Sequence, residues 1–169
     1  MTFYLLITVV ITYQIIGITQ AVLHRYIGHK RLIPFVFDSH TKSHHTIYNS
    51  NCTFESTVYS KEEASISYTF IPFAMLIAGM AYLSLPFFLF ITALLTVIAS
   101  FIMQVYLHAQ FHLANSQLQR FSWFKRYKEI HRIHHMDQTS NYGLINFNCD
   151  RIMGTFVSPE IENESGEQA

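Results

Sequence analysis

Ten histidines are the residues of this 169-residue sequence best suited to chemistry, and they fall into four short clusters. The clusters read His24-x4-His29, His40-x3-His44-His45, His108-x3-His112 and His131-x2-His134-His135. Neutral imidazole is the commonest protein ligand of transition metals, and one ion takes about four to six ligands. Ten imidazoles are too many for one ion and suit two. The sequence therefore predicts a two-metal site with all ten histidines as ligands.

Regular helical geometry explains how two of the clusters would work. Each residue of an α-helix turns by about 100°, so His108 and His112 lie only about 40° apart and can chelate one ion. His131, His134 and His135 spread over about 100°, which lets adjacent members point toward two neighbouring ions. We therefore expect both clusters on helices that face a shared cavity.

The other two clusters do not fit a regular helix. His24 and His29 would lie about 140° apart on an α-helix, so we expect the turn between them to be distorted or to end the helix. The same expectation applies to His40, His44 and His45.

The spacing does not identify the metal, because imidazole binds Zn, Cu, Fe and Ni alike. The His-Glu-x-x-His helix of hydrolytic zinc enzymes is absent from the sequence. A single histidine pair is more often a hydrogen-bonded surface pair, so the metal prediction depends on all four clusters sharing one face. Three carboxylates lie two residues from a cluster, and they either orient imidazoles or are simply solvated: Glu129, Asp137 and Asp38.

The elements that must position the histidines are two long uncharged stretches, residues 1–23 and 64–107. The second is about twice the roughly 20 residues that cross a bilayer core, and Ser84-Leu85-Pro86 interrupts it. A signal peptide and a buried soluble hairpin are the alternatives, but the first stretch lacks a basic start and the second lacks a charged face. We predict an all-α, multi-pass membrane helical bundle with three spans near 3–23, 66–83 and 86–107.

This topology places every histidine cluster at the same end of the bundle. The first span ends at His24, the hairpin returns to His108, and the remaining clusters lie between or after the spans. All eleven Lys and Arg residues fall on that side as well, which the positive-inside rule assigns to the cytoplasm. We predict an integral membrane protein whose metal site lies on the cytoplasmic side.

Charge and cysteine content exclude other classes of protein. Eleven basic and eleven acidic residues give zero net charge, so nucleic-acid binding is not expected. Cys52 and Cys149 lack a Cys-x-x-Cys spacing, and we expect free thiols rather than a disulfide framework or a thiolate metal site.

A second pattern follows the last histidine cluster, from Asn141-Tyr142-Gly143 to Asp150-Arg151-Ile152-Met153-Gly154-Thr155. Together with the clusters, it resembles the fatty acid hydroxylase and sterol desaturase superfamily, integral membrane enzymes whose histidine clusters bind two irons. In that family N-[YF]-G is followed by W-D-x-x-F-G-T, and the resemblance here runs from His24 to Thr155. Cys149 replaces the usual Trp and Met153 the usual Phe, a departure that concerns packing on the substrate side.

The resemblance implies a cofactor of two Fe ions, with Zn a possible occupant in isolated protein, and O2 as co-substrate. It implies hydroxylation of an unactivated C–H bond in a lipid such as a fatty acyl chain or a sterol, or desaturation if a second hydrogen leaves. The lipid would reach the site directly from the bilayer.

Such a reaction needs electrons. Larger relatives often carry a fused cytochrome domain, for which this sequence leaves no room, so we expect a separate electron-donor protein of the ferredoxin or cytochrome type. A basic group would either dock this donor or bind anionic lipid head groups: Arg120, Lys125, Arg126, Lys128 and Arg132. Apolar residues interleave with it at helical spacing, as in an interfacial helix or an ordinary core helix: Trp123, Phe124, Tyr127 and Ile130.

The domain prediction is one unit over residues 1–155 followed by an acidic, disordered tail over 156–169. The linker from Thr46 to Glu63 contains Tyr48, Phe54 and Tyr59, and we expect it to cover the site.

Two alternative functions accompany the lipid oxygenase. Carotenoid ring hydroxylases share the chain length and the histidine pattern, although the closing segment is closer to the acyl and sterol branch. A membrane carrier or sensor of Zn or Cu would bind metal without chemistry, but the predicted spans hold no ionisable residue for a transport path. Gln14 and Gln104 are the longest polar side chains in them.

Overall fold

The computed structural model describes residues 1–49, 54–59 and 65–159, and the side chains of 65–68 lie outside that description. The long helices are α1 (Thr2–Leu23), α4 (Ser65–Ser84), α5 (Phe87–Phe111) and α6 (Ser122–Met136). The shorter elements are the π-helix η1 (His24–Gly28), α2 (Pro34–Phe37), the π-helix η2 (Asp38–His44), α3 (His45–Ile47), the 3-10 helix η4 (Gln117–Arg120) and α7 (Asn148–Met153). Within the described ranges there is no strand, only an isolated bridge between Ser56 and Leu113, so the all-α prediction is confirmed.

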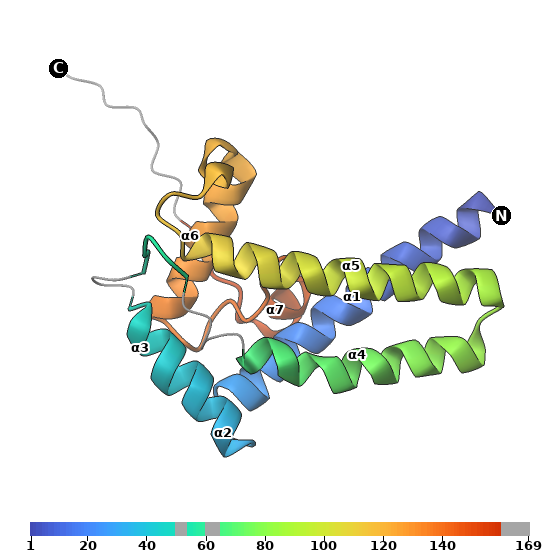
Figure 1. The fold of residues 1–169 in the computed structure, drawn as a ribbon, viewed down its shortest axis with the longest axis horizontal. Coiled ribbons are helices and arrows are strands. Elements are labelled where there is room, and N and C mark those ends of the chain that lie inside the picture. Colours follow the sequence, from blue (N-terminus) through green and yellow to red (C-terminus); the bar gives the residue numbers. More distant parts are fainter. Residues whose placement is uncertain (50–53, 60–64, 160–169) are drawn as a thin grey trace.

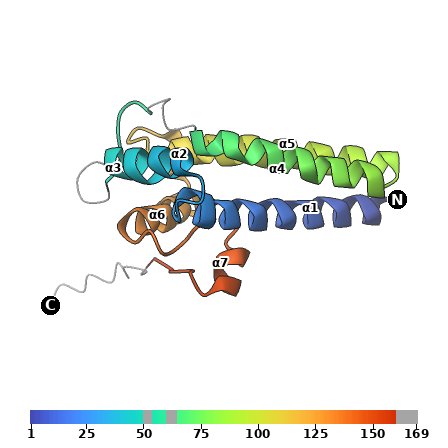
Figure 2. The same ribbon diagram turned by 90° about the horizontal axis from the view of Figure 1, so that it is seen from below.

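Three apolar helices run side by side as a two-layer bundle (Figures 1 and 2). α4 and α5 form a hairpin in one layer, and α1 packs on both helices from the other layer. The hairpin turns at Leu85 and Pro86 as predicted, because Pro86 disfavours helical backbone at Leu85 before it and then caps the start of α5.

Two segments of the described chain are long and apolar enough to cross a membrane, Thr2–Gly28 and Phe87–Phe111. In α4 the described apolar segment, Thr69–Ser84, is shorter than this length, so the third predicted span stays a prediction. Large apolar side chains point outward along all three helices, for example Phe3, Leu83 and Phe87, which are 68%, 84% and 73% exposed. Apolar surfaces of this extent are typical of helices that face lipid.

The elements that carry the histidines meet at one end of the bundle, away from the hairpin turn and the N-terminus (Figure 1). A helical rod from Pro34 to Ile47, made of α2, η2 and α3, lies beside the end of α1, and α6 crosses the same end. The predicted gathering of all four clusters at one end is therefore present in the fold.

Helix α6 is a core helix on its inner face. Phe124 is fully buried against Phe111, with ring centroids 5.3 Å apart, and Ile130 is also buried. Trp123 on the other face is 46% exposed. The apolar spacing of this helix therefore reflects mainly packing against the end of α5.

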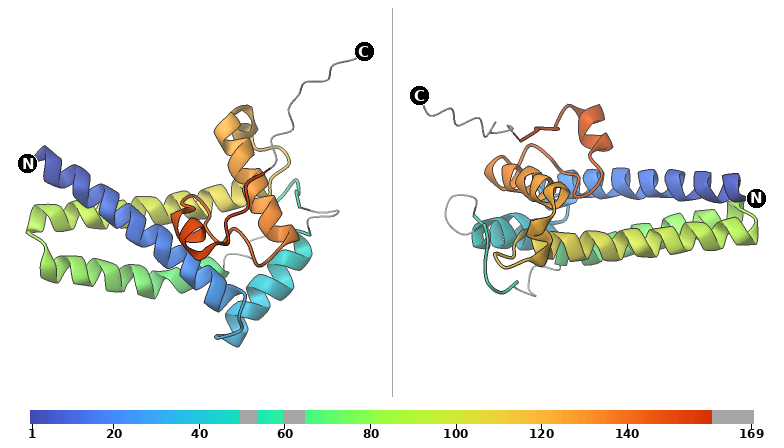
Figure 3. Two further views of the ribbon diagram at one scale, coloured as in Figure 1. Left: turned by 180° about the vertical axis from the view of Figure 1, so that it is seen from behind. Right: turned by 90° about the horizontal axis from the view of Figure 1, so that it is seen from above.

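The chain after α6 folds back on α1. Helix α7 lies against the face of α1 that points away from α4 and α5 (Figure 3). Beyond it, the Val157 amide donates to Asn141 Oδ1 at 2.8 Å, and the Phe156 ring lies 5.6 Å from that of Phe147. Residues 156–159, the start of the predicted tail, thus contact the folded unit, whereas 160–169 lie outside the described residues.

Candidate metal centre

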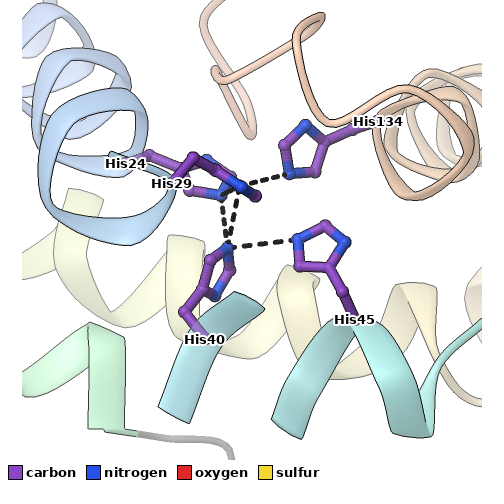
Figure 4. Close-up of side chains that lie close together, drawn as sticks. All are labelled: His24, His29, His40, His45 and His134. Atoms are coloured by element: carbon purple, nitrogen blue, oxygen red, sulfur yellow. Dashed lines mark hydrogen bonds between the residues drawn. The ribbon is translucent and has the colours of Figure 1, made fainter. Parts of the chain in front are cut away.

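Nine of the ten histidines form two groups whose ring nitrogens lie within 4.8 Å of one another. The first group contains His24, His29, His40, His45 and His134, and the second contains His44, His108, His112 and His131. Figure 4 shows the first group, in which five rings from three separate parts of the chain point toward a common centre.

The nitrogen spacings in the first group are those of metal ligands. Nε2 of His24 lies 2.7 Å from Nε2 of His40 and 3.2 Å from that of His29. Nε2 of His29 lies 3.2 Å from that of His134, and Nε2 of His40 lies 3.3 Å from that of His45. Ligands about 2.1 Å from one ion are separated by about 3.0 Å at right angles and about 3.4 Å at the tetrahedral angle. The 3.2 Å and 3.3 Å spacings lie in this range and the His24–His40 spacing is shorter, so the five nitrogens surround one centre of about the size of a metal ion.

The two π-helices explain why histidines five residues apart share this group. A π-helix has i to i+5 hydrogen bonds, so residues five apart come onto one face. The segment His24–Gly28 brings His29 beneath His24, and Asp38–His44 does the same for His40 and His45. The predicted distortion of these turns is confirmed, and its specific form is the wider helix.

The second group uses ordinary α-helical spacing. His108 and His112 lie four residues apart at the end of α5, with ring centroids 5.2 Å apart. Nε2 of His131 on α6 lies 3.0 Å from that of His112. His135, one turn after His131, adjoins this group with its Nε2 3.2 Å from that of His131.

Adjacent histidines in the chain serve different groups, which places the groups side by side. His44 belongs to the second group and His45 to the first, and His134 and His135 divide in the same way. The rings of His45 and His135 stack across the boundary with centroids 4.2 Å apart. This arrangement matches the predicted divergence of neighbouring imidazoles toward two ions.

Backbone carbonyls orient four of the imidazoles from behind. Nδ1 of His24 contacts the Tyr142 carbonyl at 2.7 Å, and Nδ1 of His134 contacts that of Ser140 at 2.7 Å. In the second group the corresponding pairs are His112 with Phe54 at 3.0 Å and His135 with Tyr48 at 2.7 Å. A carbonyl oxygen only accepts, so Nδ1 carries the proton and the Nε2 lone pair faces the centre.

The three carboxylates considered for this orienting role have other partners. Glu129 pairs with Arg132 at 2.6 Å and Asp38 with Lys42 at 2.8 Å. Oδ1 of Asp137 accepts the Thr139 amide at 2.9 Å. Among the described contacts, none of these carboxylates supports an imidazole, so that interpretation is wrong. Main-chain oxygens orient the rings instead.

Asp150 is a supporting residue whose role was not predicted from the sequence. Its side chain is fully buried, and its Oδ1 accepts the Tyr142 amide at 2.8 Å and the Thr155 hydroxyl at 2.8 Å. Its Oδ2 accepts the Gly143 amide at 2.7 Å. The carboxylate thus fixes the loop whose Tyr142 carbonyl orients His24. The signal for it was its place in the closing pattern.

The same loop is tied to α1 and tightly packed. The Gln20 amide donates to the Tyr142 carbonyl at 3.0 Å and accepts the Leu144 amide at 3.2 Å. A Cβ at Gly143 would clash with the Asn146 carbonyl oxygen and would lie 2.7 Å from Asp150 Oδ2, so a side chain at that position would displace the backbone or the carboxylate. The closing pattern therefore fixes the loop that orients His24 of the first group.

Histidines that lie outside the apolar helices are kept neutral by burial. Burial lowers the pKa of His112 to about 3, although the hydrogen bond to the Phe54 carbonyl acts in the opposite direction. For His40, His44 and His131, burial and then repulsion from neighbouring imidazoles hold the pKa well below its usual value. Neutral imidazole is the form that binds metal, so the folded chain presents ligands ready for it.

The linker between the second cluster and the hairpin covers the second group, as predicted, over its described residues. Tyr48 is buried and its ring stacks on His112, with centroids 4.1 Å apart. Phe54 lies edge-on to the same imidazole at 4.9 Å, and Tyr59 stacks on Tyr48 at 6.0 Å. The linker residues 50–53 and 60–64, including Cys52, lie outside the described residues.

A cavity opens beside the centre where α1, α4 and α5 meet. It touches His24 and His40 of the first group and His108 of the second. A second, more apolar cavity continues from it between the same helices, and the two share Gln20, Phe70, Phe101 and Gln104. This passage joins the histidines to the interior of the helical bundle.

The residues that depart from the family pattern lie away from this passage. Cys149 is a buried free thiol packed with Ala21 and Tyr142, and Met153 packs against that cluster. None of these residues is among those that line the two cavities described above. The expected effect of the departures on substrate-side packing is therefore not seen there.

Two of the five predicted basic surface residues have structural partners. Lys128 is buried, and its Nζ lies 2.9 Å from Glu55 Oε1 and donates to the Leu113 carbonyl at 3.2 Å. Arg132 is held by Glu129. The exposed members of the basic group are Arg120, Lys125 and Arg126.

Comparison with known families agrees with this site. A family model described as fatty acid hydroxylase matches residues 7–155, which include all ten histidines and the closing pattern. Comparison with curated proteins and with solved structures gives no match. Family membership and the apolar helices make the chain a membrane protein of an oxygenase-type enzyme family. The match covers most of the sequence, and we conclude that the chain belongs to the fatty acid hydroxylase family.

Proposed function

We propose that the two histidine groups hold two iron ions and that the protein oxidises a lipid with O2. The observation that carries this proposal is the convergence of nine ring nitrogens in two adjoining groups, with His135 beside the second. Five neutral nitrogens suit one ion, and four with His135 suit the other. Zn would occupy the same ligands, since imidazole does not discriminate strongly.

The bound metal would supply the redox chemistry that activates O2, which amino-acid side chains alone do not provide. In the overall reaction one C–H bond and O2 take up two electrons and two protons, and one C–O–H group and one water form. Desaturation uses the same O2, electrons and protons, but removes two hydrogens from the lipid and forms two waters. A separate ferredoxin or cytochrome would deliver the electrons.

The residues of this chain have definite tasks in that reaction. Backbone carbonyls hold the Nδ1 protons of four imidazoles, so the Nε2 lone pairs of these four stay directed at the ions: His24, His112, His134 and His135. The rings of Tyr48 and Phe54 cover the second group and limit the access of water to it. The cavity beside His24 and His108, between α1, α4 and α5, is where the lipid would approach the ions.

The membrane arrangement belongs to the same proposal. We assign three spans, α1 with η1, α4 and α5, with the histidine end on the cytoplasmic side. The support is that charged residues are absent from 1–23 and 64–107, while all eleven Lys and Arg residues belong to the segments at the histidine end. An electron donor would then approach Arg120, Lys125 and Arg126 from the cytoplasm.

Two other functions are weaker. Carotenoid ring hydroxylation would use the same centre and differs only in the substrate. A Zn or Cu carrier needs a polar path through the bundle, whereas the passage from the histidines is lined largely by apolar residues such as Phe70 and Phe101.

The test begins with anaerobic purification and metal analysis after reconstitution with iron. The expected content is about two irons per chain, with O2 uptake under reduction. Mass spectrometry of host lipids with and without the protein should then detect a gain of about 16 Da or a loss of about 2 Da. Fewer irons without O2 uptake would reject the proposal. Metal flux through vesicles that disappears in His108→Ala and His112→Ala would establish the carrier instead.

A further inference from the structure

Gln104 is a buried amide with no hydrogen-bonding partner among the described residues. It lies in α5, one turn before His108, and its side chain is only 8% exposed. Both cavities beside the metal centre include it in their lining. The other glutamine of this lining, Gln20, uses both ends of its amide on the Tyr142 and Leu144 backbone. Gln104 therefore opens onto the passage with both its donor and its acceptor available.

An unpaired amide in such surroundings is costly. Moving an amide from water to an apolar site without a hydrogen bond costs free energy, and such groups in folded proteins nearly always have a partner. The neighbours of Gln104 in the lining include Phe70, Phe101 and Val105, whose side chains cannot pair with it. Water or a polar group of a ligand in the passage would satisfy this amide.

The position of the amide restricts the ligand. Four residues of an α-helix rise about 6 Å, so Gln104 sits about 6 Å deeper in the bundle than His108. A polar group on Gln104 and a carbon at the metal centre would thus be only a few bonds apart. Beyond Gln104, the passage continues along Ala74, Ile77 and Val97, which suit an apolar chain.

Given the proposed function, we infer that Gln104 binds a hydroxyl or carbonyl oxygen that the lipid substrate carries close to the carbon that is oxidised. The substrate class is then a lipid with a polar group near one end and an apolar chain that runs into the bundle. Oxidation in the middle of a plain hydrocarbon chain does not fit this arrangement. Gln104 is a specificity-determining residue, because it selects the polar group and fixes its distance from the metal centre.

Photo-crosslinking to the metal-free full-length protein in nanodiscs tests the inference without requiring catalysis. The probes are hexadecan-1-ol and hexadecane, each with a diazirine at the same mid-chain position. Capture is measured by mass spectrometry of peptides from α1 and α5 that line the passage. One hydrogen bond corresponds to a preference of about 3-fold to 10-fold for the alcohol in the wild-type protein.

Variants separate this role from general effects on the bundle. Gln104→Leu replaces the amide with an apolar side chain that α5 should accommodate. This variant should capture both probes equally. Thr92→Val is the matched control, because the Thr92 hydroxyl bonds to the Phe88 carbonyl of its own helix, and it should keep the wild-type preference. Equal capture of the two probes by the wild type, as expected if the amide holds only water, would overturn the inference. A preference that survives in Gln104→Leu would overturn it as well.

The outcome is independent of the oxygenase proposal. Failure of iron binding or O2 uptake would leave the probe preference unchanged, since no metal is present in this experiment. Loss of the preference with normal iron binding would remove Gln104 from substrate selection and leave the proposed reaction in place.

Discussion

The imidazole of His24 donates from Nδ1 to the carbonyl oxygen of Tyr142, 2.7 Å away across 118 residues of sequence. This bond connects the end of α1 with the loop before α7, and Asp150 holds that loop through the Tyr142 and Gly143 amides. The orientation of a candidate ligand thus depends on a carboxylate that does not touch the histidines.

Replacing Asp150 should weaken the first group. In Asp150→Asn an amide donor faces the Tyr142 or Gly143 N–H, so the loop loses an acceptor and His24 loses its fixed carbonyl. We expect metal affinity of the first group to fall by about 10-fold to 100-fold and the free energy of unfolding by about 1–3 kcal/mol. Metal titration and thermal unfolding measure the two effects. Asp137→Asn is the control, because Asp137 only caps Thr139 and should leave both values unchanged.

Single histidine substitutions should remove one ion at a time. His29→Ala deletes a member of the first group and His108→Ala a member of the second. Each variant should retain about one metal per chain instead of about two, because the other group keeps its ligands. Metal analysis of each purified variant measures this content. A complete loss of metal in both variants would mean that the groups do not bind independently.

Lowering the pH should destabilise the metal-free protein. The pKa of His112 is lowered to about 3 in the folded state, whereas an unfolded histidine titrates near 6.5. Below pH 6.5 the unfolded chain therefore binds a proton that the folded chain does not, and stability falls. At pH 5.5 the loss is about 1.4 kcal/mol for each imidazole shifted in this way, and it nearly vanishes at pH 7.5. Unfolding in detergent at both pH values provides the measurement, and greater stability at pH 5.5 would contradict the buried, neutral state.

Replacing Lys128 should lower the stability of the protein more than replacing Lys125, although both residues lie on α6. Lys128 is buried, with Glu55 and the Leu113 carbonyl as partners, so Lys128→Met removes two contacts and leaves the carbonyl with only the long bond from Gln119 Nε2 at 3.4 Å. We expect a loss of about 1–2 kcal/mol, discounted because Glu55 is itself partly exposed. Lys125→Met should be neutral for stability. Equal unfolding temperatures of the two variants would show that the Lys128 contacts contribute little.

The two ends of the bundle should lie on opposite sides of the membrane. In a background with Cys52→Ser and Cys149→Ser, a thiol at Leu32→Cys or Gln119→Cys marks the histidine end, and one at Leu85→Cys marks the hairpin turn. A membrane-impermeant maleimide should label the first two only from the cytoplasmic side and the third only from the other side. Labelling of positions 32 and 119 from different sides would remove the common end on which the metal centre depends.

Much of this fold follows from patterns that are local in sequence. The uncharged stretches and Pro86 define the helical hairpin, and the four-residue spacing of His108 and His112 defines a shared helix face. The distortion at His24 and His29 was predictable as a misfit to the α-helix, but not as a π-helix, because that choice depends on which neighbours the rings must meet.

The supports of the imidazoles were not predictable in the same way. Carboxylates near the clusters, such as Glu129, attract attention, yet carbonyl oxygens of Ser140 and Tyr142 orient the rings. Every residue has a carbonyl, so side-chain identity carries no signal for this role. The division of His44 and His45 between the two groups likewise depends on the placement of α5 and α6 around the rod.

The span of 118 residues between His24 and Tyr142 also dictates when the centre can form during biosynthesis. His24 is translated well before His134 and before the Ser140 and Tyr142 carbonyls that orient the rings. A nascent chain arrested before Ser140 would have several imidazoles without their final orientation. The first group can therefore hold a metal ion with its rings in their final orientation only after this part of the chain has been made.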